Sequence, residues 1–287
     1  MAAGNDISMT IDIEGHRGAR GLRPENSLPA FACALSLGVT TLELDVGVTR
    51  DGVVVVMHDR ALNPSIVRDV SGQWLKAQGQ SLHSLSFAEL SLYDIGRINP
   101  RSDYAYEFPR QKPFDGTRVP SLGDVFDLTK KAGNEIVEFN IETKISARFP
   151  EDTLPADEFV DALLKVVWQY GLESRVIIQS FEWKTLSYVQ QVAPTIRTSY
   201  LSAQQTWFDN IRADPGQVSP WTDGFDVEQY DGSLPATVAA AGGEIWSPYY
   251  REVDEENLHE AHACGLRVIV WTVNDALEMN RLIELGV

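Results

Sequence analysis

Short apolar runs alternate with amphipathic segments along most of the chain, and this alternation limits the possible folds more than any other feature. The pattern is typical of βαβ units, in which parallel strands are covered by helices. A chain of 287 residues also matches the size of one α/β barrel, which takes roughly 250 residues. We therefore expect a single domain over residues 1–287 with the TIM-type (β/α)8 fold. The predicted strands span residues 8–14, 41–46, 138–144, 176–180, 198–202, 245–249 and 268–273.

The amphipathic segments between these strands predict helices, and several of them end at a glycine. A glycine at that place adopts the left-handed conformation that ends a helix at low cost. Ser27 and Asp275 are suited to cap the amino ends of the first and last helices. The predicted helices span residues 27–37, 121–132, 156–170, 182–192, 235–241, 252–264 and 276–285.

The dipeptide Asp51-Gly52 interrupts the alternation and predicts a tight hairpin. Residues 53–58 should therefore fold back antiparallel beside the second strand and bring His58 level with residues 43–45. Residues 60–120 then form a long, polar and weakly periodic stretch. A gap of this size inside a compact barrel is usually a functional insertion. We expect this insertion to form a small cap over the active face.

Acidic residues outnumber basic ones, with 41 Asp and Glu against 24 Lys and Arg and a net charge of −17. A surface this acidic repels polyanions, so we expect no nucleic acid partner. A small anionic substrate is still compatible, because a bound cation can reverse the sign of the charge inside a pocket. The sequence contains neither a long apolar run nor an amino-terminal signal peptide, which predicts a cytoplasmic protein without stable membrane insertion.

Two carboxylates, Glu43 and Asp45, lie in the second predicted strand. Because side chains alternate along a strand, both carboxylates point to one side while Leu42 and Leu44 point to the other. Neighbouring carboxylates repel each other and are costly to bury alone. A hard divalent cation such as Mg²⁺ or Ca²⁺ relieves this cost, because such ions prefer oxygen ligands. The alternative is an exposed strand face, against which the flanking leucines argue.

Further polar side chains follow the other strands. His16 and Arg17 come directly after the first predicted strand, and the hairpin brings His58 opposite the carboxylate pair. Glu142 and Lys144 share one face of the third predicted strand, where they could supply a third carboxylate ligand and a phosphate contact. The carboxyl ends of the strands form the active face of a barrel, so we expect all these side chains to gather there.

Four stretches of the sequence, taken in order, resemble the motifs of the glycerophosphodiester phosphodiesterase family. They read GHRGARGLRPENSLPAF at residues 15–31, GVTTLELDVGVTRDGVVVVMHD at 38–59, NIETK at 140–144 and VIVWTVND at 268–275. The resemblance extends from Glu14 to the end of the chain and is loose only across the predicted insertion. The ordered set His-Arg-Gly, Pro-Glu-Asn, Glu-x-Asp, Thr-x-Asp-Gly and His-Asp is highly specific.

The resemblance implies roles for the candidate residues that this sequence shares with the family. It implies that His16 and His58 form a catalytic acid/base pair. It also implies one bound divalent cation, Mg²⁺ or Ca²⁺, with Glu43, Asp45 and Glu142 as its ligands. Which histidine acts as the acid is left open by the sequence.

The resemblance further implies phosphate contacts from Arg17 and Lys144 and a pocket wall that includes Trp271. The implied reaction is hydrolysis of a glycerophosphodiester to glycerol 3-phosphate and an alcohol, an activity of glycerol and lipid metabolism. Residues 67–72 depart from the Arg-x-Thr-x-Gly pattern of many members, so the alcohol side of the pocket should differ. A cap formed by residues 60–120 would select the alcohol.

Two other functions fit the same motifs. A lysophospholipase D or sphingomyelinase D shares the barrel and the histidine pair, but a long apolar substrate needs an apolar rim, and residues 60–120 are polar. A barrel that binds a phosphorylated ligand without catalysis is the second alternative, and the complete set of histidines and carboxylates argues against it. The path of the reaction, by direct hydrolysis or through a cyclic phosphate, is left open.

The end of the sequence raises a separate expectation. In the resembling family a further strand, typically Asp-Gly-Ile-x-Thr-Asp-x-Pro, follows the last predicted helix and closes the barrel against the first strand. We therefore expect that Val287 is not the natural terminus and that this last strand is missing. The alternative is that residues 53–58 serve as the eighth strand.

Overall fold

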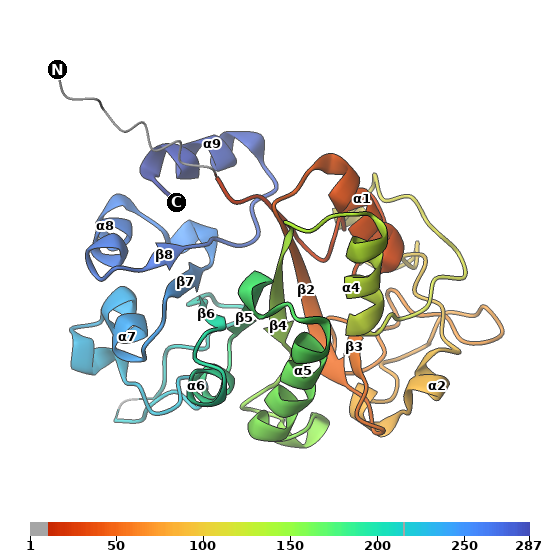
Figure 1. The fold of residues 1–287 in the computed structure, drawn as a ribbon, viewed down its shortest axis with the longest axis horizontal. Coiled ribbons are helices and arrows are strands. Elements are labelled where there is room, and N and C mark those ends of the chain that lie inside the picture. The colour runs from red at the N-terminus through yellow and green to blue at the C-terminus, as the bar shows by residue number, and fades with distance from the viewer. Residues whose placement is uncertain (1–10, 215) are drawn as a thin grey trace.

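The computed structural model describes residues 11–214 and 216–287. Its strands form one curled sheet, in which they follow the order β1-β2-β4-β5-β6-β7-β8 with every neighbouring pair parallel (Figure 1). Only β3 runs antiparallel, and it pairs with β2. The strands are β1 Glu14–Gly15, β2 Thr41–Val48, β3 Val54–Val56, β4 Glu138–Thr143, β5 Val176–Ser180, β6 Arg197–Ser202, β7 Ile245–Pro248 and β8 Arg267–Val268.

This sheet confirms the TIM-type class, in the form of a curled half-barrel. Within the described residues β1 pairs only with β2, and β8 pairs only with β7. Strand β3 lies off the path of the parallel strands, so it does not take the place of an eighth strand between β8 and β1.

The longer helices lie on the outside of the curled sheet (Figure 1). Helix α1 begins where the Ser27 hydroxyl accepts a hydrogen bond from the N–H of Ala30, and it ends at Gly38 in the left-handed conformation. Among the described residues, no helix combines the length and apolarity that crossing a membrane requires. The helices are α1 Leu28–Leu37, α2 Phe87–Leu90, α3 Tyr104–Glu107, α4 Leu122–Lys131, α5 Ala156–Tyr170, α6 Trp183–Val192, α7 Leu234–Ala240, α8 Glu255–Ala263 and α9 Ala276–Leu285.

The first and last parallel strands are shorter than predicted. Residues 8–10 lie outside the described residues. The N–H of Ile13 donates to the side-chain oxygen of Thr40, and the pairing of β1 with β2 begins only at Glu14. Strand β8 was predicted to reach residue 273 but ends at Val268. Pro248 at the end of β7 has no N–H for the ladder, and pairing resumes only at the single bridge between Tyr249 and Trp271.

Side chains of the central strands alternate between two environments. On β2, Leu42 and Leu44 are fully buried in the main hydrophobic core, which also includes side chains of α1, α4, α5 and α6. Glu43 and Asp45 alternate with these leucines and therefore point into the inside of the curled sheet. The packing of the helices thus forces the polar residues of the strands together.

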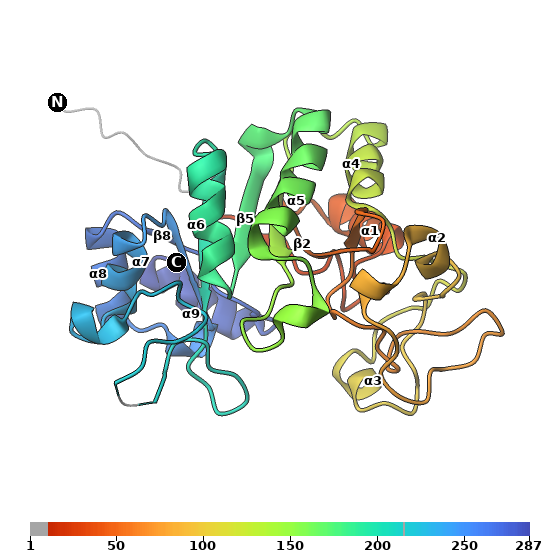
Figure 2. The same cartoon turned by 90° about the horizontal axis from the view of Figure 1, so that it is seen from below.

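The predicted insertion contains a small hydrophobic core of its own. Val55 of β3 and Met57 pack with side chains of residues 62–95 and with Val119, so the segment is anchored on the hairpin. Helices α2 and α3 are short, and loops make up most of the insertion. In Figure 2 the insertion and the loop between β6 and α7 both lie on the lower side of the molecule, at its right and left.

Candidate active site

The register of β2 and β4 brings three carboxylates together. Glu43 lies beside Asn140, and Asp45 lies beside Glu142. The residues Glu43, Asp45 and Glu142 are 5%, 1% and 8% exposed. Each offers a carboxylate oxygen, and these oxygens all lie within 4.8 Å of one another. All three donors are hard oxygen atoms, the type that Mg²⁺ and Ca²⁺ prefer.

Burial makes negative charge costly on two of these residues. It raises the pKa of Glu43 well above its usual range, and the charges of Asp45 and Glu142 add to the effect. Burial also raises the pKa of Glu142, although Lys144 works against it. The Lys144 ammonium donates a hydrogen bond to Glu142 Oε1 at 2.6 Å. A single lysine therefore does not neutralise the cluster.

Asp45 is the carboxylate with the most favourable surroundings. Burial alone would raise its pKa, but His58, Arg17 and Lys144 outweigh burial and hold the pKa of Asp45 well below its usual range. Asn26 donates a hydrogen bond to Asp45 Oδ2 at 2.8 Å. The other oxygen, Oδ1, is buried without a hydrogen-bond partner among the described residues, and Lys144 Nζ lies 3.6 Å from it. An unpaired buried carboxylate oxygen inside a group of carboxylates fits a divalent cation.

Arg17 is anchored on three carboxylates. Its backbone N–H donates to Glu43 Oε2 at 2.8 Å, and its Nη1 donates to Glu25 Oε1 at 2.8 Å. Its Nε lies 3.2 Å from Asp45 Oδ2. The guanidinium therefore lies at the edge of the carboxylate group, where it can meet a phosphate.

A tight turn at residues 15–18 places Arg17. Both Arg17 and Gly18 have positive φ angles, of 51° and 76°. A Cβ on Gly18 would lie 2.7 Å from the backbone of Ala30, so only glycine allows α1 to pack this closely on the turn. The close packing of α1 thus explains why the third position of the His-Arg-Gly motif is a glycine.

His58 reaches the site through the hairpin, as the Asp51-Gly52 signal predicts. The N–H of Met57 donates to the carbonyl oxygen of Asp45 at 2.9 Å, which puts His58 beside β2. His58 Nδ1 lies 2.9 Å from Asp59 Oδ1, and Asn63 donates to Asp59 Oδ2 at 2.6 Å. Despite its burial, the hydrogen bond with His58 lowers the pKa of Asp59 to about 2. An ionised carboxylate only accepts hydrogen bonds, so Nδ1 of His58 donates to Asp59, and no described residue forms a hydrogen bond with Nε2.

His16 has the opposite surroundings. Arg20 Nη2 lies 3.0 Å from His16 Nδ1, and a guanidinium can only donate, so Nδ1 accepts and the ring proton is on Nε2. Nε2 in turn lies 3.7 Å from Glu43 Oε2. Burial, Arg17 and Arg20 together hold the pKa of His16 well below its usual range.

A chain of amides supports the carboxylates from inside the sheet. Gln179 on β5 donates to Glu43 Oε1 at 3.0 Å. Asn140 donates to Gln179 Oε1 at 3.2 Å and to Glu14 Oε2 at 3.0 Å. Burial and the charge of Asp12 raise the pKa of Glu14 to about 8.

Trp271 belongs to a group of aromatic side chains from the segments that follow β5, β6, β7 and β8. Its ring centroid lies 5.3 Å from Phe181, 5.4 Å from Tyr249 and 6.2 Å from Trp207. Its indole N–H donates to the carbonyl oxygen of Ser247 at 3.0 Å. Among the described residues, Trp271 therefore contacts this aromatic group and the backbone of Ser247.

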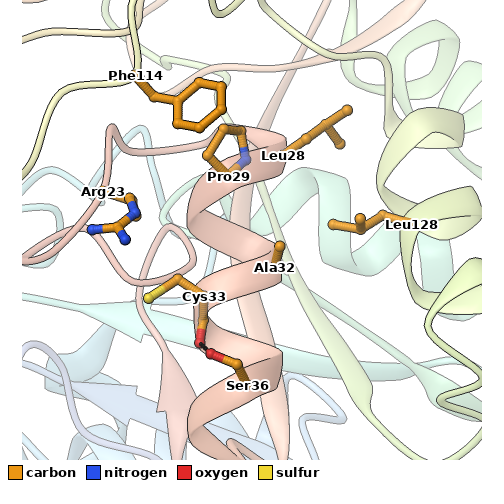
Figure 3. A pocket seen from close by; sticks show the side chains of 8 residues that line it. All are labelled: Arg23, Leu28, Pro29, Ala32, Cys33, Ser36, Phe114 and Leu128. Atoms are coloured by element: carbon orange, nitrogen blue, oxygen red, sulfur yellow. Dashed lines mark hydrogen bonds between the residues drawn. The ribbon is translucent and has the colours of Figure 1, made fainter.

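A hollow of about 500 Å³ lies elsewhere, on the outside of the barrel beside α1 and α4 (Figure 3). None of the predicted site residues lines it, and its walls are mostly apolar. The lining residues are Arg23, Leu28, Pro29, Ala32, Cys33, Ser36, Phe114 and Leu128.

The structure gathers the predicted carboxylates with Arg17, Lys144, His16 and His58, and it leaves Trp271 among aromatic neighbours. Sequence reasoning missed the residues that hold this group. Glu25 and Asn26 stand in the Pro-Glu-Asn motif, but that motif suggested no role for them. A single glutamine in the apolar run of β5 was the available signal for Gln179. The missed residues are Arg20, Glu25, Asn26, Asp59 and Gln179.

The parallel half-barrel holds buried carboxylates, Arg17, Lys144 and two histidines at one end. This arrangement is that of a TIM-type hydrolase site suited to an anionic substrate. The family model of the glycerophosphoryl diester phosphodiesterase family matches residues 16–287. The chain belongs to this family and is a phosphodiesterase.

Similar proteins cover nearly the whole chain. A glycerophosphodiester phosphodiesterase of Caldanaerobacter subterraneus is 28% identical over 96% of this chain and 90% of its own. One of Bacillus subtilis is 29% identical over 95% of this chain and 80% of its own. A crystal structure from Silicibacter pomeroyi, of a protein named for the same activity, is 36% identical with a TM-score of 0.83 over 97% of this chain and 88% of its own. A phosphodiesterase structure from Oleispira antarctica has 20% identity, with a TM-score of 0.67 over 96% of this chain and 90% of its own, and supports the fold.

Proposed function

We propose that this chain hydrolyses glycerophosphodiesters to glycerol 3-phosphate and an alcohol, with the help of one divalent cation. The observation that supports this most is the buried group of Glu43, Asp45 and Glu142 with Arg17 and Lys144 at its edge. Relatives named glycerophosphodiester phosphodiesterases agree with it. The Oleispira antarctica phosphodiesterase is described in complex with sn-glycerol-3-phosphate.

We assign the cation, Mg²⁺ or Ca²⁺, to Glu43, Asp45 and Glu142. The unpaired Oδ1 of Asp45 and the raised pKa values of the two glutamates support this assignment. When bound, such an ion neutralises charge on the phosphoryl oxygens. Arg17 and Lys144 would bind the same oxygens and orient the phosphorus.

We assign different roles in acid–base catalysis to the two histidines. His58 Nε2 is free to take a proton from the attacking hydroxyl, and Asp59 stabilises the imidazolium that forms. His16 presents Nε2–H as a donor to an oxygen on which charge develops. The oxygen of the attacking hydroxyl, from water or from the glycerol 2-hydroxyl, forms a bond to phosphorus as the bond from phosphorus to the alcohol oxygen breaks. The departing oxygen then takes up the proton that His58 gained.

We also propose that residues 60–120 select the alcohol. Their small core on β3 gives them a fixed place next to His58, which supports this role. If the proposal is right, exchange of exposed loops in this segment changes the ranking of head groups and leaves a small generic diester largely unaffected. Equal loss of both activities in a folded variant would argue for a purely structural role.

The test of the function is product analysis after incubation with glycerophosphocholine. We expect glycerol 3-phosphate and choline, in the presence of Mg²⁺ or Ca²⁺. Glycerol with phosphocholine as products would place the cleavage on the wrong side of phosphorus. Hydrolysis of lysophosphatidylcholine or sphingomyelin in preference to glycerophosphocholine would favour the phospholipase D alternative.

A further inference from the structure

A segment of the insertion, residues 104–112, lies directly on the loop that carries His16 and Arg17. Gln111 Nε2 donates to the carbonyl oxygen of Arg20 at 2.8 Å. The backbone N–H of Lys112 donates to the carbonyl oxygen of Leu22 at 3.0 Å. The Arg20 guanidinium lies 4.6 Å from the ring centroid of Phe108. We name residues 104–112 the clasp.

Tyr104, at the start of the clasp, reaches furthest into the site. Its hydroxyl donates to Glu25 Oε2 and accepts a hydrogen bond of 3.3 Å from Arg20 Nη1. Glu25 is only 6% exposed, and its other oxygen accepts from Arg17 Nη1 at 2.8 Å. Burial and the charge of Glu25 raise the pKa of Tyr104, so the phenol keeps its proton and remains a donor.

We infer that Tyr104 is a positioning residue for Arg17, and that the insertion thereby takes part in the reaction. The inference rests on the proposed function, in which Arg17 binds the phosphoryl oxygens. Tyr104 occupies Glu25 Oε2 and leaves only Oε1 for Arg17. Arg17 Nη1 then donates to Glu25 Oε1, while Nε lies 3.2 Å from Asp45 Oδ2 as an ion pair without a hydrogen bond, and no described residue accepts a hydrogen bond from Nη2.

Loss of the hydroxyl has a definite consequence for this geometry. Glu25 Oε2 becomes a buried acceptor without its donor, which is unfavourable. A bidentate ion pair with Arg17 is the nearest way to satisfy this oxygen, because the geometry of a guanidinium matches that of a carboxylate. Arg17 would then turn towards Glu25 and lose its contact with the phosphate.

The test is Tyr104→Phe beside Tyr106→Phe in the full-length protein supplied with Mg²⁺ or Ca²⁺. Tyr106 is a matched control, because it lies on the same helix and is 80% exposed. Tyr104→Phe should lower kcat/KM on glycerophosphocholine by up to about 10²-fold, the loss that a misplacement of roughly 1 Å can cause. It should also weaken the binding of inorganic phosphate measured by calorimetry. Tyr106→Phe should change neither quantity.

The mechanism through Arg17 is tested by a double-mutant cycle. In an Arg17→Ala background, Tyr104→Phe should have almost no further effect on phosphate binding, because the group it positions is gone. A full effect in that background would overturn the inference. So would kinetics and phosphate binding of Tyr104→Phe that match those of Tyr106→Phe.

A second variant covers the case in which Tyr104→Phe does not fold. Phe108→Leu removes the ring beneath Arg20 and loosens the clasp without touching Glu25, so phosphate binding should weaken again. Unchanged phosphate binding in this variant would contradict the inference. Failure of the wild-type protein to hydrolyse any diester would instead refute the proposed function, and the phosphate-binding comparison would still decide the role of Tyr104.

Discussion

At the scale of single residues, the two histidines differ through the partner of Nδ1. Asp59 accepts from Nδ1 of His58, whereas Arg20 donates to Nδ1 of His16. Burial and the positive charges of Arg17 and Arg20 oppose a positive charge on the ring of His16 and hold its pKa well below its usual range. The same side chain thereby gains two chemical characters within one site.

If the two histidines act in the same chemical step, the losses of activity caused by removing each of them are not additive. His58→Ala should lower kcat roughly 10²–10⁴-fold, the usual contribution of a positioned acid or base. The double variant with His16→Ala should lose far less than the product of the two single losses. Steady-state kinetics on one diester with all three variants measures this. Near-normal turnover of His58→Ala would refute the paired mechanism.

At the scale of elements, the turn at residues 15–18 joins α1 to the site. Helix α1 packs on Gly18 so closely that the turn and the helix form one unit, and Arg17 follows the position of that unit. The Pro-Glu-Asn segment then leads directly into α1, whose Ser27 cap fixes where the helix begins.

Gly18→Ala should disrupt the packing of α1 on the turn at residues 15–18. The added methyl group would strike the backbone of Ala30, and alanine is also strained at the φ angle of 76°. We expect a destabilisation of about 1–3 kcal/mol together with a loss of activity. Gly21→Ala is the control, because a Cβ there would meet nothing within 4 Å. Thermal unfolding of both variants checks this, and equal melting temperatures would show that the close packing is unimportant.

The elements also show what the sequence could and could not predict. Strand alternation predicted that Glu43 and Asp45 share a face, and Asp51-Gly52 predicted the hairpin that brings in His58, because both signals are local. The contact of Tyr104 with Glu25 joins residues 79 apart, so no local pattern announces it. The end of β8 at Val268 depended on pairing with β7, which the apolar run alone does not reveal.

At the scale of the whole molecule, the inside of the half-barrel is an unusually polar interior. Glu14, Asn140, Gln179 and Glu43 form a continuous chain of hydrogen bonds from β1 to the carboxylate group. A carboxyl inside such an interior binds its proton more tightly than in the unfolded chain. Stability should therefore depend on pH.

The titration of Glu14 determines the direction in which stability changes with pH. Its pKa is about 8 in the folded protein against 4.5 as the ordinary value, so between these values the folded state holds a proton that the unfolded chain has lost. Stability from this group is therefore complete at low pH and is lost as the pH rises towards 8. Glu14→Gln should therefore lose less stability than the wild type between roughly pH 5 and pH 8, because an amide has no proton to lose in this range. Denaturant unfolding at roughly pH 5 and 8 measures the difference, and parallel pH curves would contradict the assignment.

We propose that the phosphodiesterase activity of this barrel requires a divalent cation bound to Glu43, Asp45 and Glu142. The most direct measurement is the rate of glycerophosphocholine hydrolysis by protein treated with EDTA, before and after Mg²⁺ or Ca²⁺ is restored. We predict that EDTA removes the activity, that the ion restores it, and that Glu43→Gln is not rescued at the same ion concentration. Full activity of the wild-type protein in excess EDTA would contradict the account.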